Sequence, residues 1–293
     1  MARLLEGELV EYRGAIWIVK GFQHPPGYVV AYPRYDALTL RKLEGWRVEK
    51  LVRESMGMWR CIELELPMVP LDEARFIQPQ SSDPVLEEFR RLIADYASID
   101  RDQVLPTGSL ALGVESDDPD IDLVIYCWRA ERVYGALEEL ARLGIVRSMG
   151  LSELESEWRR KHLGMSFEVY RRLREGSLLQ GVFRGRRYSI RIVPWERGVE
   201  GCVDPVRRGG ARRMVIEIVE PVSPYTTPAI YEVEVVGEGL RATMMSFRML
   251  FTELARGTRI AGVMEVETSL LEARPRIVPD RGVVEWVEKP SSL

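Results

Sequence analysis

The residues best suited to chemistry lie close together near the middle of the chain. A Gly108-Ser109 pair is separated by ten residues from an Asp-Ile-Asp triplet whose acidic members are Asp120 and Asp122. Because side chains alternate along a strand, the two aspartates project from the same face. Carboxylates this close repel each other unless a cation lies between them. Mg²⁺, which prefers carboxylate and phosphate oxygens, is the expected cation.

The glycine-serine pair suits a phosphate group. Gly108 has no side chain, so a phosphate can approach its backbone, and the Ser109 hydroxyl and neighbouring N–H groups can donate hydrogen bonds to it. A phosphate-binding loop beside a metal-binding pair predicts a ligand that carries phosphate, with Mg²⁺ as cofactor. This is the equipment for moving a nucleotidyl group.

The composition indicates a globular protein of two or three domains. The chain has 293 residues, of which 46% are hydrophobic and 29% charged. No apolar run approaches the roughly 20 residues that span a bilayer, and the acidic N-terminus does not resemble a signal peptide. We therefore expect a cytoplasmic protein without a membrane partner. Three isolated cysteines predict neither a disulfide framework nor a zinc site, and two histidines are too few for His-based chemistry.

Two compositional biases bear on the source and the partners. The chain contains 36 Arg, five Lys and no Asn, which is typical of a thermophilic protein, although a GC-rich genome also favours Arg. The segment from Arg171 to Arg213 holds twelve Arg and four acidic residues, a local charge of +8 within a net charge of −4. Such a segment fits a polyanion such as RNA, or a surface whose arginines pair with carboxylates.

The pattern of elements predicts an α+β protein with three domains. Residues 1–80 are expected to form a small β-rich domain, with a hairpin turn at Gly14. Residues 81–200 are expected to form an α/β domain with a mixed sheet, opened by a helix that starts at Asp83-Pro84. A linker over 198–210 and a small, mostly β domain over 211–293, with one helix at 246–255, are expected to follow.

The central motif resembles the nucleotidyltransferase superfamily, which has a DNA polymerase beta-like fold. The resemblance rests on Gly108-Ser109, the ten-residue spacing, Asp120, Asp122 and the apolar strand after them, and it covers roughly residues 83–195. Less specifically, the segments 21–27 and 31–35 resemble an archaeal group of predicted nucleotidyltransferases without an assigned role.

The resemblance implies a mechanism. Asp120 and Asp122 would bind Mg²⁺ that bridges the triphosphate of an NTP, and Gly108 and Ser109 would hold its β- and γ-phosphates. A hydroxyl acceptor, whether RNA, protein or a small compound, would attack the α-phosphate and release pyrophosphate.

The chain departs from the family at the third carboxylate, which active members carry on a later strand. The corresponding strand here, Tyr188–Pro194, is expected to turn Arg191 toward the metals. A guanidinium cannot ligate a cation, although it can neutralise an aspartate or hold a phosphate. Glu217 and Glu168 are candidate substitutes.

Arg191, Arg186 and Arg187 are the candidate contacts to phosphate or another polyanion. Three functions therefore stay open: an active Mg²⁺-dependent nucleotidyltransferase, a degenerate protein of the same fold that binds a nucleotide or RNA without transferring it, and a scaffold that retains only the fold.

Overall fold

Over the residues that the structure describes, the protein is a mixed α+β chain with several sheets and five α-helices. The structure is a computed structural model that describes residues 3–114, 120–161 and 164–290. The chain divides into two compact units. Unit 1 contains residues 1–136 and 184–204, and unit 2 contains residues 137–183 and 205–293. The boundaries of the three predicted domains differ from those of the two units and stay a prediction.

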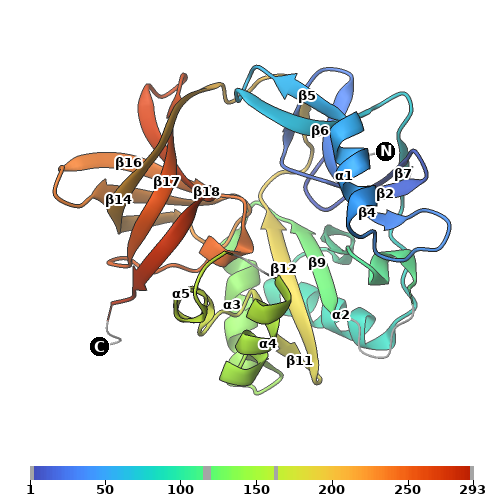
Figure 1. Cartoon of the computed structure of the whole chain (residues 1–293). Coiled ribbons are helices and arrows are strands. Elements are labelled where there is room, and N and C mark those ends of the chain that lie inside the picture. Colours follow the sequence, from blue (N-terminus) through green and yellow to red (C-terminus); the bar gives the residue numbers. More distant parts are fainter. Residues whose placement is uncertain (1–2, 115–119, 162–163, 291–293) are drawn as a thin grey trace. The chain divides into compact units, whose positions relative to one another are not determined.

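Unit 1 begins with a six-stranded sheet in the order β5-β6-β4-β2-β1-β7. Its strands are β1 (Leu9–Tyr12), β2 (Ala15–Val19), β4 (Tyr28–Asp36), β5 (Met56–Trp59), β6 (Leu64–Pro70) and β7 (Arg75–Ile77). The predicted hairpin turn lies at Arg13 and Gly14, which both have positive φ. Sequence analysis missed the helix α1 (Trp46–Glu54), which contacts β4 (Figure 1).

The second part of unit 1 carries the aspartates on a mixed sheet. Strand β9 (Ile121–Tyr126) pairs antiparallel with β8 (Val104–Pro106) and parallel with β12 (Arg186–Val193) (Figure 1). Helix α2 (Pro84–Ala97) contacts β8 and begins where predicted, because the Asp83 carboxylate accepts a hydrogen bond from the Leu86 N–H at 2.8 Å. The remaining elements here are η1 (Arg101–Gln103), η2 (Leu110–Leu112) and α3 (Ala130–Arg142), the last of which crosses the boundary between the units.

Within unit 1, the N-terminal segment packs directly on the strands that carry the site. Leu5 shares an apolar cluster with Val124 of β9 and Val193 of β12. A Cβ at Gly7 would lie 3.2 Å from the Val124 side chain, so the backbone there approaches β9 closely. The Thr107 hydroxyl donates a 2.9 Å hydrogen bond to the Gly7 carbonyl. These contacts fix the first residues of the chain beside the aspartates.

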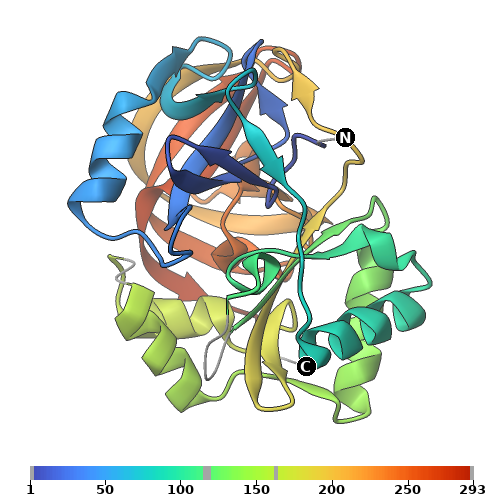
Figure 2. The ribbon, with the colours of Figure 1, turned by 90° about the vertical axis from the view of Figure 1, so that its right-hand side faces the viewer.

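Unit 2 contains a closed barrel of five strands in the order β14-β15-β16-β18-β17. The strands are β14 (Val206–Ser223), β15 (Ala229–Val235), β16 (Leu240–Ser246), β17 (Arg259–Ser269) and β18 (Arg274–Glu288). Helices α4 (Leu151–Lys161) and α5 (Phe167–Arg174) lie side by side (Figure 2) and share the barrel's apolar core. The pair β10 (Val146–Ser148) and β11 (Gln180–Phe183) completes unit 2, together with η3 (Met249–Phe251).

Three expectations for local structure were wrong. The predicted linker over 198–210 contains β13 (Val199–Glu200), which pairs with β3 (Gln23–His24), and the start of β14. The predicted helix over 246–255 is reduced to the single turn η3, which is followed by Glu253 at positive φ. Cys61 and Cys202 form a disulfide across 141 residues of sequence, a pairing that spacing alone cannot indicate.

The described part of the chain has no helix with both the length and the apolar character that a membrane crossing requires.

We expect the Cys61–Cys202 bond to contribute substantially to stability. It closes a loop of 141 residues, and removing a native cross-link costs about 2–5 kcal/mol. The double variant C61S/C202S should unfold at lower denaturant concentration than the wild type. Dithiothreitol should lower the wild-type midpoint and leave that of the variant unchanged. Equal midpoints for the wild type with and without reductant, together with three free thiols in the untreated denatured protein, would contradict the bond.

His24 makes stability depend on pH. Its ring is fully buried, its Nε2 lies 2.8 Å from the Leu4 carbonyl, and its Nδ1 accepts a hydrogen bond from the Val30 N–H. Burial lowers the pKa of His24 from 6.5. The unfolded chain therefore binds a proton that the folded chain excludes, so the free energy of unfolding falls as the pH drops below about 6.5.

The matched variant H24Q removes this titration. Between pH 7.5 and 5.5, denaturation should show a smaller loss of stability for H24Q than for the wild type, by at most about 1.4 kcal/mol per pH unit. Identical slopes for the two proteins would show that His24 is not held neutral.

Candidate functional site

Asp120 and Asp122 lie at the start of β9 and face the same strand, β12. The register pairs Ser189 with Asp122, so Arg187 lies beside Asp120. The Arg187 Nε donates to Asp120 Oδ1 at 3.0 Å, and the Ser189 hydroxyl donates to Asp122 Oδ1 at 2.5 Å. The expectation that both aspartates share one face agrees with these contacts. Each carboxylate is held by a donor from β12.

The predicted phosphate loop lies against Asp122. Gly108 has φ +68°, and a Cβ there would lie 2.7 Å from Asp122 Oδ2. The Thr107 N–H donates to the Asp122 carbonyl at 2.9 Å, which fixes the start of the loop to β9. Ser109 precedes the single turn η2, and its carbonyl accepts hydrogen bonds from the Leu112 and Val114 N–H groups. Residues 115–119, part of the spacing to Asp120, lie outside the described residues.

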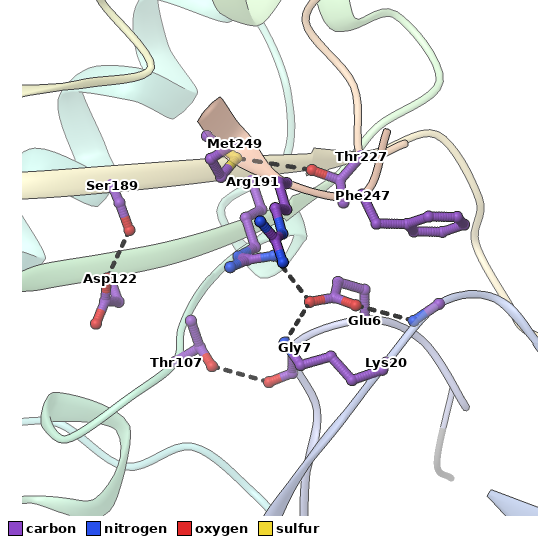
Figure 3. A network of polar contacts seen from close by, with 12 residues as sticks. Glu6, Gly7, Lys20, Thr107, Asp122, Ser189, Arg191, Thr227, Phe247 and Met249 are labelled. Carbon is purple, nitrogen blue, oxygen red and sulfur yellow. Dashed lines mark hydrogen bonds and ion pairs between the residues drawn. The ribbon is translucent and has the colours of Figure 1, made fainter. Parts of the chain in front are cut away.

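Sequence analysis missed a third carboxylate near this face. Glu6 is only 4% exposed, and both Lys20 Nζ and Arg191 Nη1 contact its Oε1, at 2.8 and 2.9 Å (Figure 3). The Gly21 N–H donates to Oε2 at 2.8 Å. Nothing in the spacing indicates this contact, because 185 residues separate Glu6 from Arg191.

The charges around Glu6 determine its protonation. Burial alone would raise the pKa of Glu6, but the charges of Lys20 and Arg191 and the hydrogen bonds from Lys20 and Gly21 lower it below its ordinary value. Glu6 is therefore ionised at neutral pH. Desolvation and the charges of Arg191 and Arg34 lower the pKa of Lys20, against the effect of Glu6.

Strand β4 of the N-terminal sheet adds an aromatic residue to the site. Tyr35 is buried, and desolvation raises the pKa of its hydroxyl, as does the negative charge of Asp122. The Arg34 guanidinium, which is hydrogen-bonded to Tyr35, opposes this shift. Tyr35 also packs with Ala111, which follows the Gly108-Ser109 loop. The N-terminal sheet therefore contacts the site itself.

The structure differs from the expectation that Arg191 replaces the third carboxylate opposite the aspartates. The register pairs Arg191 with Val124, and the residue opposite Asp122 is Ser189. The pattern of β12 gives the face but not the register, because a parallel strand can shift by two residues and keep the same face. The candidate substitutes Glu217 and Glu168 lie in unit 2, where Glu217 pairs with Arg259 and Glu168 with Arg171 and Arg172.

The arginine-rich segment is largely neutralised. Of its twelve arginines, ten form ion pairs with carboxylates, and among them Arg186 contacts Asp83 at 2.9 Å. The structure therefore favours the interpretation that these charges pair within the protein over that of a free polyanion-binding surface.

The oxygen ligands that Asp120 and Asp122 offer suit one Mg²⁺ ion better than two. Mg²⁺ is commonly bound by one or two carboxylates together with substrate phosphates, which Asp120 and Asp122 beside the Gly108 loop could supply. A two-metal centre needs a further ligand. Among the residues described, no group of three or more His, Cys, Asp or Glu side chains is arranged to hold a metal ion.

Comparisons with known proteins do not assign the site. No family model, no curated protein and no solved structure matches the chain.

The close approach of Gly108 to Asp122 can be tested with matched glycines. Gly14 has the same φ of +68°, but a Cβ there would have nothing within 4 Å. G14A should cost about 1 kcal/mol of unfolding free energy through backbone strain alone. G108A should cost more, because its Cβ also displaces the Asp122 carboxylate. Denaturant unfolding of both variants measures the difference, and equal losses would show that Asp122 does not crowd the loop.

Proposed function

We propose that this chain binds a nucleoside triphosphate, as its Mg²⁺ complex, at the face formed by Asp120, Asp122 and the Gly108-Ser109 loop of a nucleotidyltransferase-like domain. The observation that carries the proposal is the backbone of Gly108 lying against the Asp122 carboxylate. This contact supports the proposal because a polyphosphate bound with its metal needs backbone donors and carboxylate ligands close together.

The residues have distinct roles in this proposal. Asp120 and Asp122 would hold the ion, which neutralises the triphosphate and orients it. Gly108 and Ser109 would donate to the phosphates. Arg187, now paired with Asp120, would be available to a phosphate when the metal takes its place on the carboxylate. Ser189 keeps Asp122 in one orientation.

Nucleotidyl transfer is the second candidate. It would use the same two aspartates and the same loop as binding does, because the metal-bound triphosphate is also the substrate for transfer. A serine opposite Asp122 and an arginine on Asp120 favour binding without transfer, because a hydroxyl and a guanidinium do not complete a second metal site.

Binding can be tested by melting and titration with each of the four common nucleoside triphosphates and Mg²⁺. At 100 times its dissociation constant, a ligand should add about 2.7 kcal/mol to the unfolding free energy. D120N and D122N should lose at least ten-fold in affinity for the Mg²⁺ complex. D95N, on the exposed face of α2, is the control and should bind like the wild type. If none of the four nucleotides stabilises the protein, the proposal is overturned.

The same proteins separate transfer from binding. The protein is incubated with α-labelled nucleotide, Mg²⁺ and cellular RNA. If it binds the nucleotide without transferring it, the label should stay on the nucleotide. Label in RNA, with release of pyrophosphate, would establish transfer. D122N should abolish that signal, whereas D95N should keep it.

A further inference from the structure

Lys20 and Arg191 form a second cluster of charge beside the aspartates. Both basic groups contact the single oxygen Glu6 Oε1, so one carboxylate serves two bases. With Lys20 protonated, the three side chains carry a net charge of +1. Arg34 lies close enough to contribute its charge to Lys20. Lys20 and Arg191 are 35% and 30% exposed, whereas Glu6 is 4% exposed. The carboxylate is therefore buried beneath two cations that still reach solvent.

One member of the cluster, Arg191, lies on β12, the strand that also contacts both aspartates. Arg187, Ser189 and Arg191 alternate on one face of β12, and the first two contact Asp120 and Asp122. Arg191 is the next residue on that face, and Figure 3 shows it extending toward Glu6. Successive residues on one face of a strand are about 7 Å apart, a step comparable to the length of a polyphosphate.

A buried carboxylate that serves two cations is a means of positioning them. Glu6 fixes the Lys20 ammonium and the Arg191 guanidinium before any ligand arrives, so less side-chain entropy is lost on binding. Because one charge cannot neutralise two, the cluster keeps an attraction for an anion. Arginine and lysine together suit phosphate, the first by paired N–H donors and the second as a point charge.

We propose that Lys20 and Arg191, positioned by Glu6, bind the terminal phosphate of a polyphosphate chain. The inner phosphates would lie at the Gly108 loop, which differs from the β- and γ-phosphate contacts that the family resemblance implies for this loop. That the polyphosphate belongs to a nucleotide rests on the proposed function. That Lys20 and Arg191 bind a polyphosphate does not. A monophosphate is too short to reach both the loop and the two cations, so the site should bind triphosphates more tightly than monophosphates. The N-terminal sheet supplies part of the site, since Lys20 follows β2.

The test uses inorganic tripolyphosphate and the series ATP, ADP and AMP, titrated into the full chain. K20M and R191M should each weaken tripolyphosphate binding at least ten-fold and should reduce the preference for ATP over AMP. K50M and R91M remove exposed charges elsewhere in unit 1 and are matched controls that should bind like the wild type. Tripolyphosphate affinities of K20M and R191M within two-fold of the wild type would overturn the proposal.

The variant E6Q distinguishes ligand binding from a structural role. Glutamine has one oxygen, so it can accept from Lys20 or from the Gly21 N–H but not from both, and the two cations are held less firmly. It also removes the negative charge that opposes an anion, and because this gain in net positive charge outweighs the looser positioning, tripolyphosphate should bind several-fold more tightly. If K20M or R191M does not fold, the test rests on E6Q. Tripolyphosphate binding by E6Q that is unchanged or weaker than that of the wild type would overturn the proposal.

The two proposals fail separately. Nucleotide binding that depends on Asp122 but not on Lys20 or Arg191 rejects only this inference. Tripolyphosphate binding that depends on Lys20 and Arg191, without any gain from a nucleoside, supports this inference and rejects the nucleotide.

Discussion

The crowding around the Asp122 carboxylate is the constraint on which the site depends. One oxygen lies where a side chain at Gly108 would have to be, and the other accepts the Ser189 hydroxyl. The residue at 108 must therefore lack a Cβ and tolerate positive φ, which only glycine does without strain. The same carboxylate then links three segments: the loop, β9 and β12. A ligand at the loop would be in direct reach of this acid.

The N-terminal sheet is part of the same unit and contributes to the site's charge. Glu6, Lys20 and Tyr35 all come from residues that precede the predicted α/β domain, yet they interact with β9 or β12 residues. Removing one partner of such a buried ionic contact leaves an uncompensated charge, which is far more costly than losing a surface pair. These contacts, together with the apolar packing of Leu5 on Val124 and Val193, join the N-terminal residues to the strands that carry the aspartates.

Arginine serves mainly as an internal counter-ion in this chain. The ten paired arginines of the basic segment include Arg186, Arg187 and Arg191. Because surface ion pairs are weak, an incoming phosphate can compete for such arginines where they are partly exposed. Arg191 differs from the exposed pairs because its carboxylate is buried and shared with Lys20. This sharing, and not the count of arginines, leaves positive charge at the site.

The sequence by itself determined the elements whose signals are local. The face shared by Asp120 and Asp122 follows from the two-residue repeat of a strand, and the start of α2 follows from Asp83 and Pro84. The mixed α+β class followed from the same kind of pattern. The turn at Gly14 is also local, because a tight turn there favours a residue free to adopt positive φ.

Only the tertiary structure decided which distant residues meet. The register that places Ser189 opposite Asp122, the contact of Glu6 with Arg191, and the disulfide between Cys61 and Cys202 all join segments separated by many residues. A strand keeps its face when it shifts by two residues, and a buried ion pair leaves no periodic pattern in sequence. Such contacts depend on how sheets pack, so the one-dimensional pattern cannot contain them.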